Sequence, residues 1–219
     1  MIKAVIFDLD GTLTTIEERF YAVVRDSLRK YTKNTLDRNE LLKSFNFDTV
    51  DQLLIKTGLT KEKIQNFWLD FLIGYRQQKY WKISKLIGGV VDTLRELKNK
   101  GLKLALITGG IANQESFSKE LEYLGIKEFF DVALPGSGSE DIDKEWRKKG
   151  QVEKALDFLK MKPSECILIG DYVADIKTAK YFGMKSVLVG KRKSLHLDAD
   201  LNLDDFSRGL NLKTLENRF

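Results

Sequence analysis

The sequence predicts an α/β fold in which helices flank a parallel sheet and a small helical domain is inserted after the first strand. From Gly88 onward, short apolar runs alternate with segments of helical periodicity, the pattern of βαβ units. Between the first apolar run and that point, residues from about Ile16 to Ile83 show helical periodicity without a strand signal. We therefore expect a core domain of residues 1–15 and 84–219 and a helical domain of residues 16–83.

The first strand and the first helix are predicted from a change in the spacing of apolar residues along the chain. Ile2–Phe7 is an apolar run of β-branched character that ends at Asp8, which predicts a buried strand. Further on, apolar residues that begin with Phe20 recur at the spacing of one helix face. Thr15 and Glu18 have the spacing of a capping box, so we expect the helix to begin there.

The remaining elements alternate along the chain. Leu36–Thr57 predicts one or two short helices, and a long helix is expected after Thr60. The strands expected in the core domain are Lys103–Ile107, Phe130–Leu134, Cys166–Ile169 and Ser186–Val189, and the helices are Val90–Asn99, Gln114–Leu124, Gln151–Leu159 and Val173–Phe182.

Composition narrows the class of protein. The 37 Lys and Arg stand against 32 Asp and Glu, a net charge of +5, but the two signs are interspersed, which favours a solvated surface over a nucleic-acid partner. The apolar runs fall far short of the ~18 residues of a membrane span. The lone Cys166 excludes an internal disulfide, and the N-terminus carries no cleavage signal. We expect a cytoplasmic protein with no membrane partner.

Polar side chains recur where the predicted strands stop: Asp8 and Asp10, Thr108, then Asp171 and Asp175. The carboxyl ends of parallel strands meet at one edge of a sheet, where ligands bind. Four carboxylates at that edge would repel one another without a cation, and oxygen ligands suit Mg²⁺. Each residue also has an ordinary interpretation, as a turn after a strand or a helix N-cap. Their joint occurrence favours a site for Mg²⁺ and phosphate.

These residues also form motifs. The segments Asp8-Leu9-Asp10-Gly11-Thr12, Thr108-Gly109, a downstream lysine and Gly170-Asp171-Tyr172-Val173-Ala174-Asp175 resemble, in order, the four motifs of the haloacid dehalogenase-like (HAD) phosphohydrolase superfamily. The resemblance covers nearly the whole chain, because the helical insertion is similar to the C1-type cap of that family. It points to the phosphoglycolate phosphatase-like branch, and implies a cap that sets specificity.

The resemblance implies a role for each residue of the first two motifs. Asp8 would be the nucleophile that takes up the phosphoryl group. Asp10 would protonate the leaving group and then activate water. Thr12 is expected to orient Asp10. Thr108 and Gly109 are expected to bind the phosphoryl oxygens.

The resemblance also implies the metal ligands. Mg²⁺ would be held by Asp8, by the backbone carbonyl of Asp10 and by Asp171, with Asp175 bound directly or in support. The lysine lies in the segment from Asp143 to Gly150, which holds three candidates. Lys149, directly before a glycine, resembles the Lys-Gly form of the motif and is the predicted catalytic and phosphate-binding residue. Lys148 is the second choice and Lys144 the third, and a solvated basic run explains any one of them equally well.

The resulting hypothesis is a Mg²⁺-dependent phosphatase that acts on a small phosphorylated metabolite. A phosphomutase of the β-phosphoglucomutase type would use the same nucleophile. A non-catalytic phosphate- or nucleic-acid-binding protein on the same fold is the alternative from another class. A dehalogenase would not need the carboxylate cluster, and a receiver domain would not need the insertion. The oligomeric state, monomer or homodimer, stays open.

Overall fold

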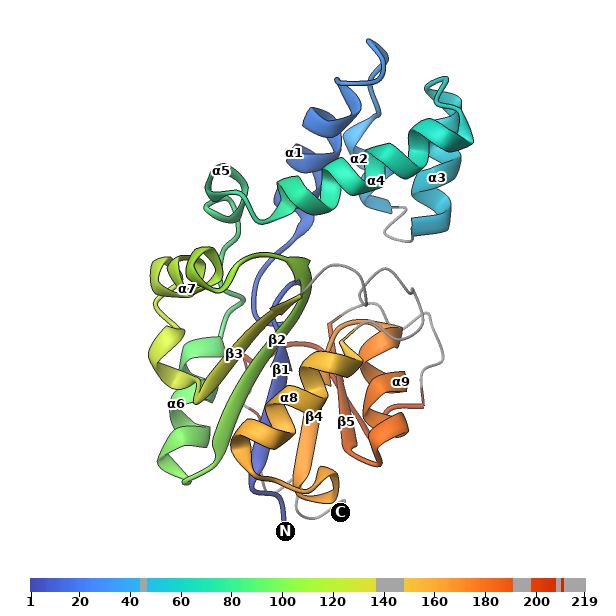
Figure 1. The fold of residues 1–219 in the computed structure, drawn as a ribbon. Coiled ribbons are helices and arrows are strands. Elements are labelled where there is room, and N and C mark those ends of the chain that lie inside the picture. Colours follow the sequence, from blue (N-terminus) through green and yellow to red (C-terminus); the bar gives the residue numbers. More distant parts are fainter. Residues whose placement is uncertain (44–46, 137–147, 191–197, 208–209, 211–219) are drawn as a thin grey trace. The chain divides into compact units, whose positions relative to one another are not determined.

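The computed structural model describes residues 1–43, 47–136, 148–190, 198–207 and 210. The chain divides into two units (Figure 1). One comprises Met1–Thr15 and Lys85–Phe219, and is called the core unit below. The other comprises Ile16–Ser84 and is called the insert unit. Among the described residues, no helix is both long and apolar enough to cross a membrane.

The core unit is built on a six-stranded parallel sheet in the order β3-β2-β1-β4-β5-β6, so β1 lies between β2 and β4 (Figure 1). Its strands are β1 (Ala4–Asp8), β2 (Lys103–Ile111), β3 (Val132–Gly136), β4 (Cys166–Gly170), β5 (Lys185–Val189) and β6 (Leu201–Leu203). Its helices are α6 (Val90–Asn99), α7 (Gln114–Tyr123), α8 (Lys149–Leu159) and α9 (Val173–Phe182), with short 3₁₀ turns at Lys127–Phe129 and Pro163–Glu165. The predicted fold class is confirmed.

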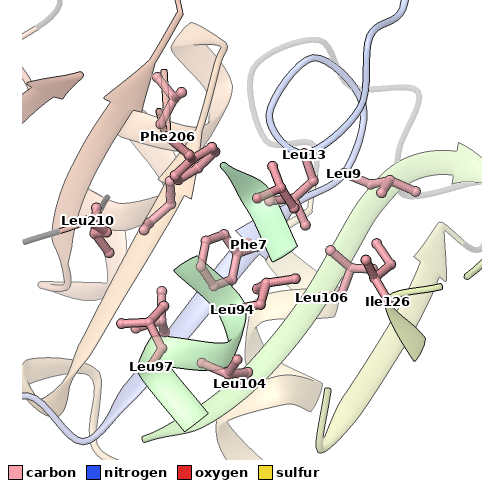
Figure 2. Packing of buried hydrophobic residues seen from close by; sticks show 14 of the residues in the cluster. Phe7, Leu9, Leu13, Leu94, Leu97, Leu104, Leu106, Ile126, Phe206 and Leu210 are labelled. Atoms are coloured by element: carbon pink, nitrogen blue, oxygen red, sulfur yellow. The ribbon is translucent and has the colours of Figure 1, made fainter. Parts of the chain in front are cut away.

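Alternate residues of β1, β2 and β4 belong to two separate hydrophobic cores, because successive side chains point to opposite faces of a sheet. Phe7 of β1 and Leu106 of β2 pack with Leu94 and Leu97 of α6 on one face (Figure 2). Ile6 and other alternate residues pack with apolar residues of α8 and α9 on the opposite face. Both faces are therefore covered, which explains why the strands are apolar along their length.

The insert unit consists of helices and a core of its own. Its helices are α1 (Glu17–Leu28), α2 (Arg38–Lys43), α3 (Phe47–Lys56), α4 (Lys61–Tyr75) and α5 (Gln78–Trp81). An aromatic pair lies between α1 and α4: Phe20 packs edge-on against Phe71, with ring centroids 5.4 Å apart. Thr60 caps α4 by accepting a hydrogen bond from the Lys63 amide.

The expected capping box of Thr15 and Glu18 is wrong. Helix α1 begins at Glu17, and its N-cap, Ile16, makes no side-chain capping bond. The Thr15 hydroxyl instead accepts from the Lys85 amide at 3.2 Å, and the Thr15 amide donates to the Lys85 carbonyl at 2.8 Å. The two places where the chain leaves and re-enters the core unit are therefore tied to each other.

Candidate active site

The loop after β1 folds back on the residue that ends the strand. Asp8 is the last residue of β1 and only 2% exposed. Gly11 has φ +88°, and a Cβ there would stand 2.3 Å from Oδ2 of Asp171. Glycine is thus required twice, for the left-handed backbone and for the close approach. The turn brings the Thr12 hydroxyl back to donate to Oδ2 of Asp8 at 3.1 Å.

Asp10 is held from the neighbouring strand rather than by Thr12. The hydroxyl of Thr108 donates to Oδ2 of Asp10 at 3.0 Å. This contact follows from the register, since β2 runs beside β1 with Ile107 opposite Asp8. The expectation that Thr12 orients Asp10 is therefore corrected: in the structure Thr12 holds Asp8. Gly109 directly follows Thr108 in β2.

Three carboxylates converge at the ends of β1 and β4. One oxygen from each of Asp8, Asp171 and Asp175 lies within 4.8 Å of the others, and all three residues are buried. A Cβ at Gly170 would stand 2.2 Å from Cγ of Asp175, so only glycine admits this side chain. Asp175 also accepts from the Tyr172 amide at 3.1 Å; Tyr172 is the N-cap of α9, so Asp175 supports the start of the helix from its third position and is not the N-cap itself. Three clustered hard oxygen donors fit a divalent cation such as Mg²⁺.

The lysine in this cluster is Lys148. Its Nζ donates to Oδ1 of Asp8 at 2.6 Å and to Oδ1 of Asp175 at 2.7 Å. The residue is 8% exposed and stands in the left-handed region, with φ 79°, directly before α8. A Cβ at Gly109 would lie 3.8 Å from Cε of Lys148, so the lysine side chain passes beside the end of β2.

The prediction that Lys149 joins the cluster is therefore corrected. Its Nζ donates to the hydroxyl of Tyr181, an exposed residue of α9, at 2.8 Å. The physical reason is the left-handed backbone of Lys148, which stands outside the helix at φ 79°, whereas Lys149 is the first residue of α8, so the two side chains leave the backbone in different directions. Lys144, the third candidate, lies outside the described residues.

Burial and crowding shift the ionisation of this cluster. Burial raises the pKa of the Asp8 carboxyl to about 7, against the lowering effect of Lys148 and with a further rise from the charges of Asp175 and Asp10. Burial by itself lowers the pKa of Lys148, but Asp175 and Asp8 outweigh it, so its pKa is raised and the side chain stays protonated. Added positive charge nearby would therefore strongly favour the ionised form of Asp8, the candidate nucleophile.

Gln151 belongs to the same neighbourhood, although the sequence analysis did not single it out. It lies in the first turn of α8, is buried, and its Nε2 donates to the Thr108 carbonyl at 3.3 Å. The signal available in the sequence was a polar residue next to Val152 on the apolar face of the helix. The start of α8 therefore contacts β1 through Lys148 and β2 through Gln151.

Comparison with known proteins agrees with this geometry. The family model for haloacid dehalogenase-like hydrolases matches residues 5–189. Pyrophosphatase PpaX of Halalkalibacterium halodurans is 29% identical over 192 residues, 86% of this chain and 84% of that protein. The crystal structure of a predicted phosphatase from Clostridium acetobutylicum matches with a TM-score of 0.77 at 24% identity, covering 99% of this chain and 100% of the other. A predicted phosphoglycolate phosphatase from Haemophilus somnus gives 0.74 at 21%, covering 100% and 98%.

Proposed function

Since the chain belongs to the haloacid dehalogenase-like hydrolase family and is a phosphatase of that family, we propose that it hydrolyses a small phosphorylated compound with Mg²⁺ through an aspartyl-phosphate on Asp8. One observation carries the proposal. Lys148 and two further carboxylates converge on Asp8, while Asp10, two residues along, is held separately by Thr108. This separates a nucleophile from a proton donor within one short loop.

The carboxylates of Asp8 and Asp171 and the backbone carbonyl of Asp10 would hold the Mg²⁺ ion. Asp175 would bind it directly or support it, since its two oxygens already accept from Lys148 and from the Tyr172 amide. When bound, the ion supplies positive charge that neutralises the transferring phosphoryl group. The Gly11 and Gly170 positions leave the space that lets Asp171 and Asp175 come this close.

In the first step, an oxygen of the Asp8 carboxylate attacks phosphorus in line with the leaving group. A phosphorus–oxygen bond to Asp8 forms as the bond to the leaving oxygen breaks. Asp10, protonated at this stage, gives its proton to that leaving oxygen. The hydrogen bond from Thr108 keeps the Asp10 carboxyl oriented for this transfer.

In the second step, water attacks the phosphorus of the aspartyl-phosphate. Asp10, now ionised, takes one proton from this water, so its acid form is restored. The bond between phosphorus and Asp8 breaks, and inorganic phosphate leaves. Lys148 stays protonated throughout and offsets the negative charge that gathers on Asp8 and the phosphoryl oxygens. The Gly109 amide is the proposed donor to those oxygens. The one hydrogen of the Thr108 hydroxyl is donated to Asp10 in the structure, so Thr108 would reach them only by turning away from that carboxyl.

The substrate belongs to the class of small phosphate esters and anhydrides. The similarity to a protein named pyrophosphatase favours testing inorganic pyrophosphate first, and the resemblance to the phosphoglycolate phosphatase-like branch favours 2-phosphoglycolate. A mutase would instead return an isomer. A panel of these substrates with p-nitrophenyl phosphate and β-glucose 1-phosphate, scored for both phosphate and isomerised sugar, separates the two reactions.

The proposal is tested by Asp8→Asn together with metal removal. We expect the variant to lose at least about 10³-fold in kcat on every substrate of the panel, because the amide is a poor nucleophile. EDTA should silence the natural enzyme and Mg²⁺ should restore it. Asp92→Asn, on the exposed side of α6, is the matched control and should keep full activity. Undiminished turnover by Asp8→Asn would contradict the proposed chemistry.

A further inference from the structure

The C-terminal part of the chain places Phe206 in the core of the core unit. Phe206 stands in a turn in which Oδ1 of Asp205 accepts from the Ser207 amide at 2.8 Å. Aspartate commonly stabilises a turn by accepting from the amide two residues further on. The Phe206 side chain points inward from this turn: it is 1% exposed and belongs to the same hydrophobic core as Phe7 and Leu13 (Figure 2).

The ring of Phe206 contacts the strand that carries the candidate nucleophile. Its centroid lies 6.4 Å from the centroid of the Phe7 ring, with the two ring planes at 55°. Aromatic pairs of this kind contribute more than the area that they bury. Phe7 directly precedes Asp8 in β1, so a fixed Phe7 also fixes the backbone from which the Asp8 carboxylate projects.

The backbone of Phe206 lies against the place where the chain re-enters the core unit. Gly89, the N-cap of α6, has φ +83°, and a Cβ there would stand 2.2 Å from the Phe206 carbonyl oxygen. Only glycine allows both this backbone and this close approach. Gly101, just after the other end of α6, has a similar φ of +78°, but a Cβ there would meet no atom within 4 Å.

Just before Gly89, the returning chain is paired with the loop that carries Asp10. The Ile87 amide donates to the Leu13 carbonyl at 2.9 Å. The Leu13 amide in turn donates to the Leu9 carbonyl at 2.9 Å, which closes the loop around Asp10. A displacement of Gly89 would therefore reach the proposed proton donor through Ile87 and Leu13.

We propose that Phe206 is a positioning residue of the hydrolysis, which holds Asp8 through Phe7 and Asp10 through Gly89. Phosphoryl transfer needs the nucleophile and the proton donor in a fixed relative position, and a displacement of about 1 Å can cost about 10²-fold in rate. The inference rests on the roles of Asp8 and Asp10 in the proposed function. It adds to them a residue from the opposite end of the chain.

The test compares Gly89→Ala with Gly101→Ala, which adds the same methyl group at a similar φ without the collision. We expect Gly89→Ala to lower kcat about tenfold on phenyl phosphate, whose leaving group needs a proton, and clearly less on p-nitrophenyl phosphate. Gly101→Ala should stay within about twofold on both substrates. Hydrogen exchange of the Ile87 amide should be about tenfold faster in Gly89→Ala and unchanged in Gly101→Ala. Each variant is measured below its unfolding transition.

Each outcome decides one point. Equal losses of turnover in the two glycine variants would assign the effect to backbone strain and overturn the role of Phe206. A loss in Gly89→Ala that is uniform over both substrates would also overturn it. If the natural protein hydrolyses neither substrate, the proposed function fails, whereas the exchange of the Ile87 amide still reports whether Phe206 holds the returning chain.

A second variant keeps the proposal testable if Gly89→Ala does not fold. Phe206→Leu stays apolar but loses the ring contact with Phe7. It should slow both substrates, phenyl phosphate the more, and speed up exchange of the Ile87 amide. Unchanged turnover in folded Phe206→Leu would contradict the proposal.

Discussion

Carboxylates of the insert unit and of the core-unit cluster are used in opposite ways. In the insert unit, Asp70 has donors of its own: the Tyr31 hydroxyl at 2.7 Å and Lys30 at 2.8 Å. Hydrogen bonds from Lys30 and Tyr31 hold the pKa of the Asp70 carboxyl below its usual value. In the core unit, burial raises the pKa of Asp8 to about 7, and its nearest cation is shared with a second buried carboxylate.

The difference separates structural from functional acids. The Asp70 carboxylate has two donors that it shares with no other acid among the described residues, and it ties α4 to the turn that follows α1. Carboxylates that crowd around one ammonium repel one another in the empty site, and they bind a cation more strongly because it relieves that repulsion. The same side chain therefore serves stability in α4 and chemistry at the end of β1.

The largest expected effect comes from removing the Lys148 ammonium, which Asp8 and Asp175 share. We predict that Lys148→Met lowers kcat/KM by about 10²–10³-fold, because it removes a buried donor aimed at the reacting charge. Lys149→Met, one residue along, removes only the surface contact to Tyr181 and should stay within about twofold. Steady-state kinetics with p-nitrophenyl phosphate and saturating Mg²⁺ compare the two. Equal losses would show that the neighbouring lysines are not distinguished as the structure has them.

The second effect concerns stability and pH. The pKa of Asp8 lies near 7 in the folded, metal-free protein and near 3.8 in the unfolded chain, so the folded state binds this proton more tightly. Its contribution is fully present below about pH 4 and is lost as the pH rises through about 7. At most about 4 kcal/mol is involved. Asp8→Asn should therefore be stabilised relative to the natural protein at about pH 8, and much less at about pH 5.

Urea unfolding in EDTA across this pH range measures the difference between the two proteins directly. Adding Mg²⁺ supplies an internal control, because it should stabilise the natural protein more than Asp8→Asn at the higher pH. A difference in unfolding free energy that does not change with pH would contradict the shifted pKa.

In the insert unit, the contribution of Asp70 to the free energy of unfolding should change with pH in the opposite direction to that of Asp8, and by a smaller amount. The lowered pKa of Asp70 means that its contribution is present above the unfolded value of 3.8 and is lost as the pH falls. Asp70→Asn should cost about 1 kcal/mol at neutral pH, since the pair is partly exposed, and progressively less in acid. Glu62→Gln, at an exposed position of the same helix, is the control. A cost that grows toward acid pH would be inconsistent with the structure.

Much of this arrangement was predictable from local pattern. Strand β1, which ends at Asp8, and strand β4, which ends just before Asp171, are continuous apolar runs, and both their order and the family are confirmed. Strand β6 was not predicted, because three residues with two leucines give no periodicity. Its pairing depends on β5, which is a long-range contact.

The choice between the two lysines could not be made from the local sequence pattern. Lys148 and Lys149 are chemically identical and adjacent, and what distinguishes them is the left-handed backbone at the start of α8. That conformation is maintained by contacts with β1 and α9, far away in the sequence. Thr15 was assigned to a helix cap for the same reason: its actual partner, Lys85, lies on the other side of the insertion.

The smallest expected effect tests how far the core cluster depends on its support. Gln151 donates to the Thr108 carbonyl, and Thr108 in turn donates to Asp10. Gln151→Met keeps the size of the side chain but not the donor. One hydrogen bond of ordinary strength, about 1 kcal/mol, corresponds to about fivefold in rate.

This loss should depend on the leaving group if Gln151 acts through Asp10. Phenyl phosphate needs a proton on departure and should be slowed about fivefold, whereas a nitrophenolate leaves without one and should be slowed less. Lys154→Met, exposed on the same helix, controls for general effects on α8. A uniform loss over both substrates, with lowered thermal stability, would mean that Gln151 only packs α8 against the sheet. A loss confined to phenyl phosphate would instead show that Gln151 supports proton transfer by Asp10, to which it is connected through Thr108.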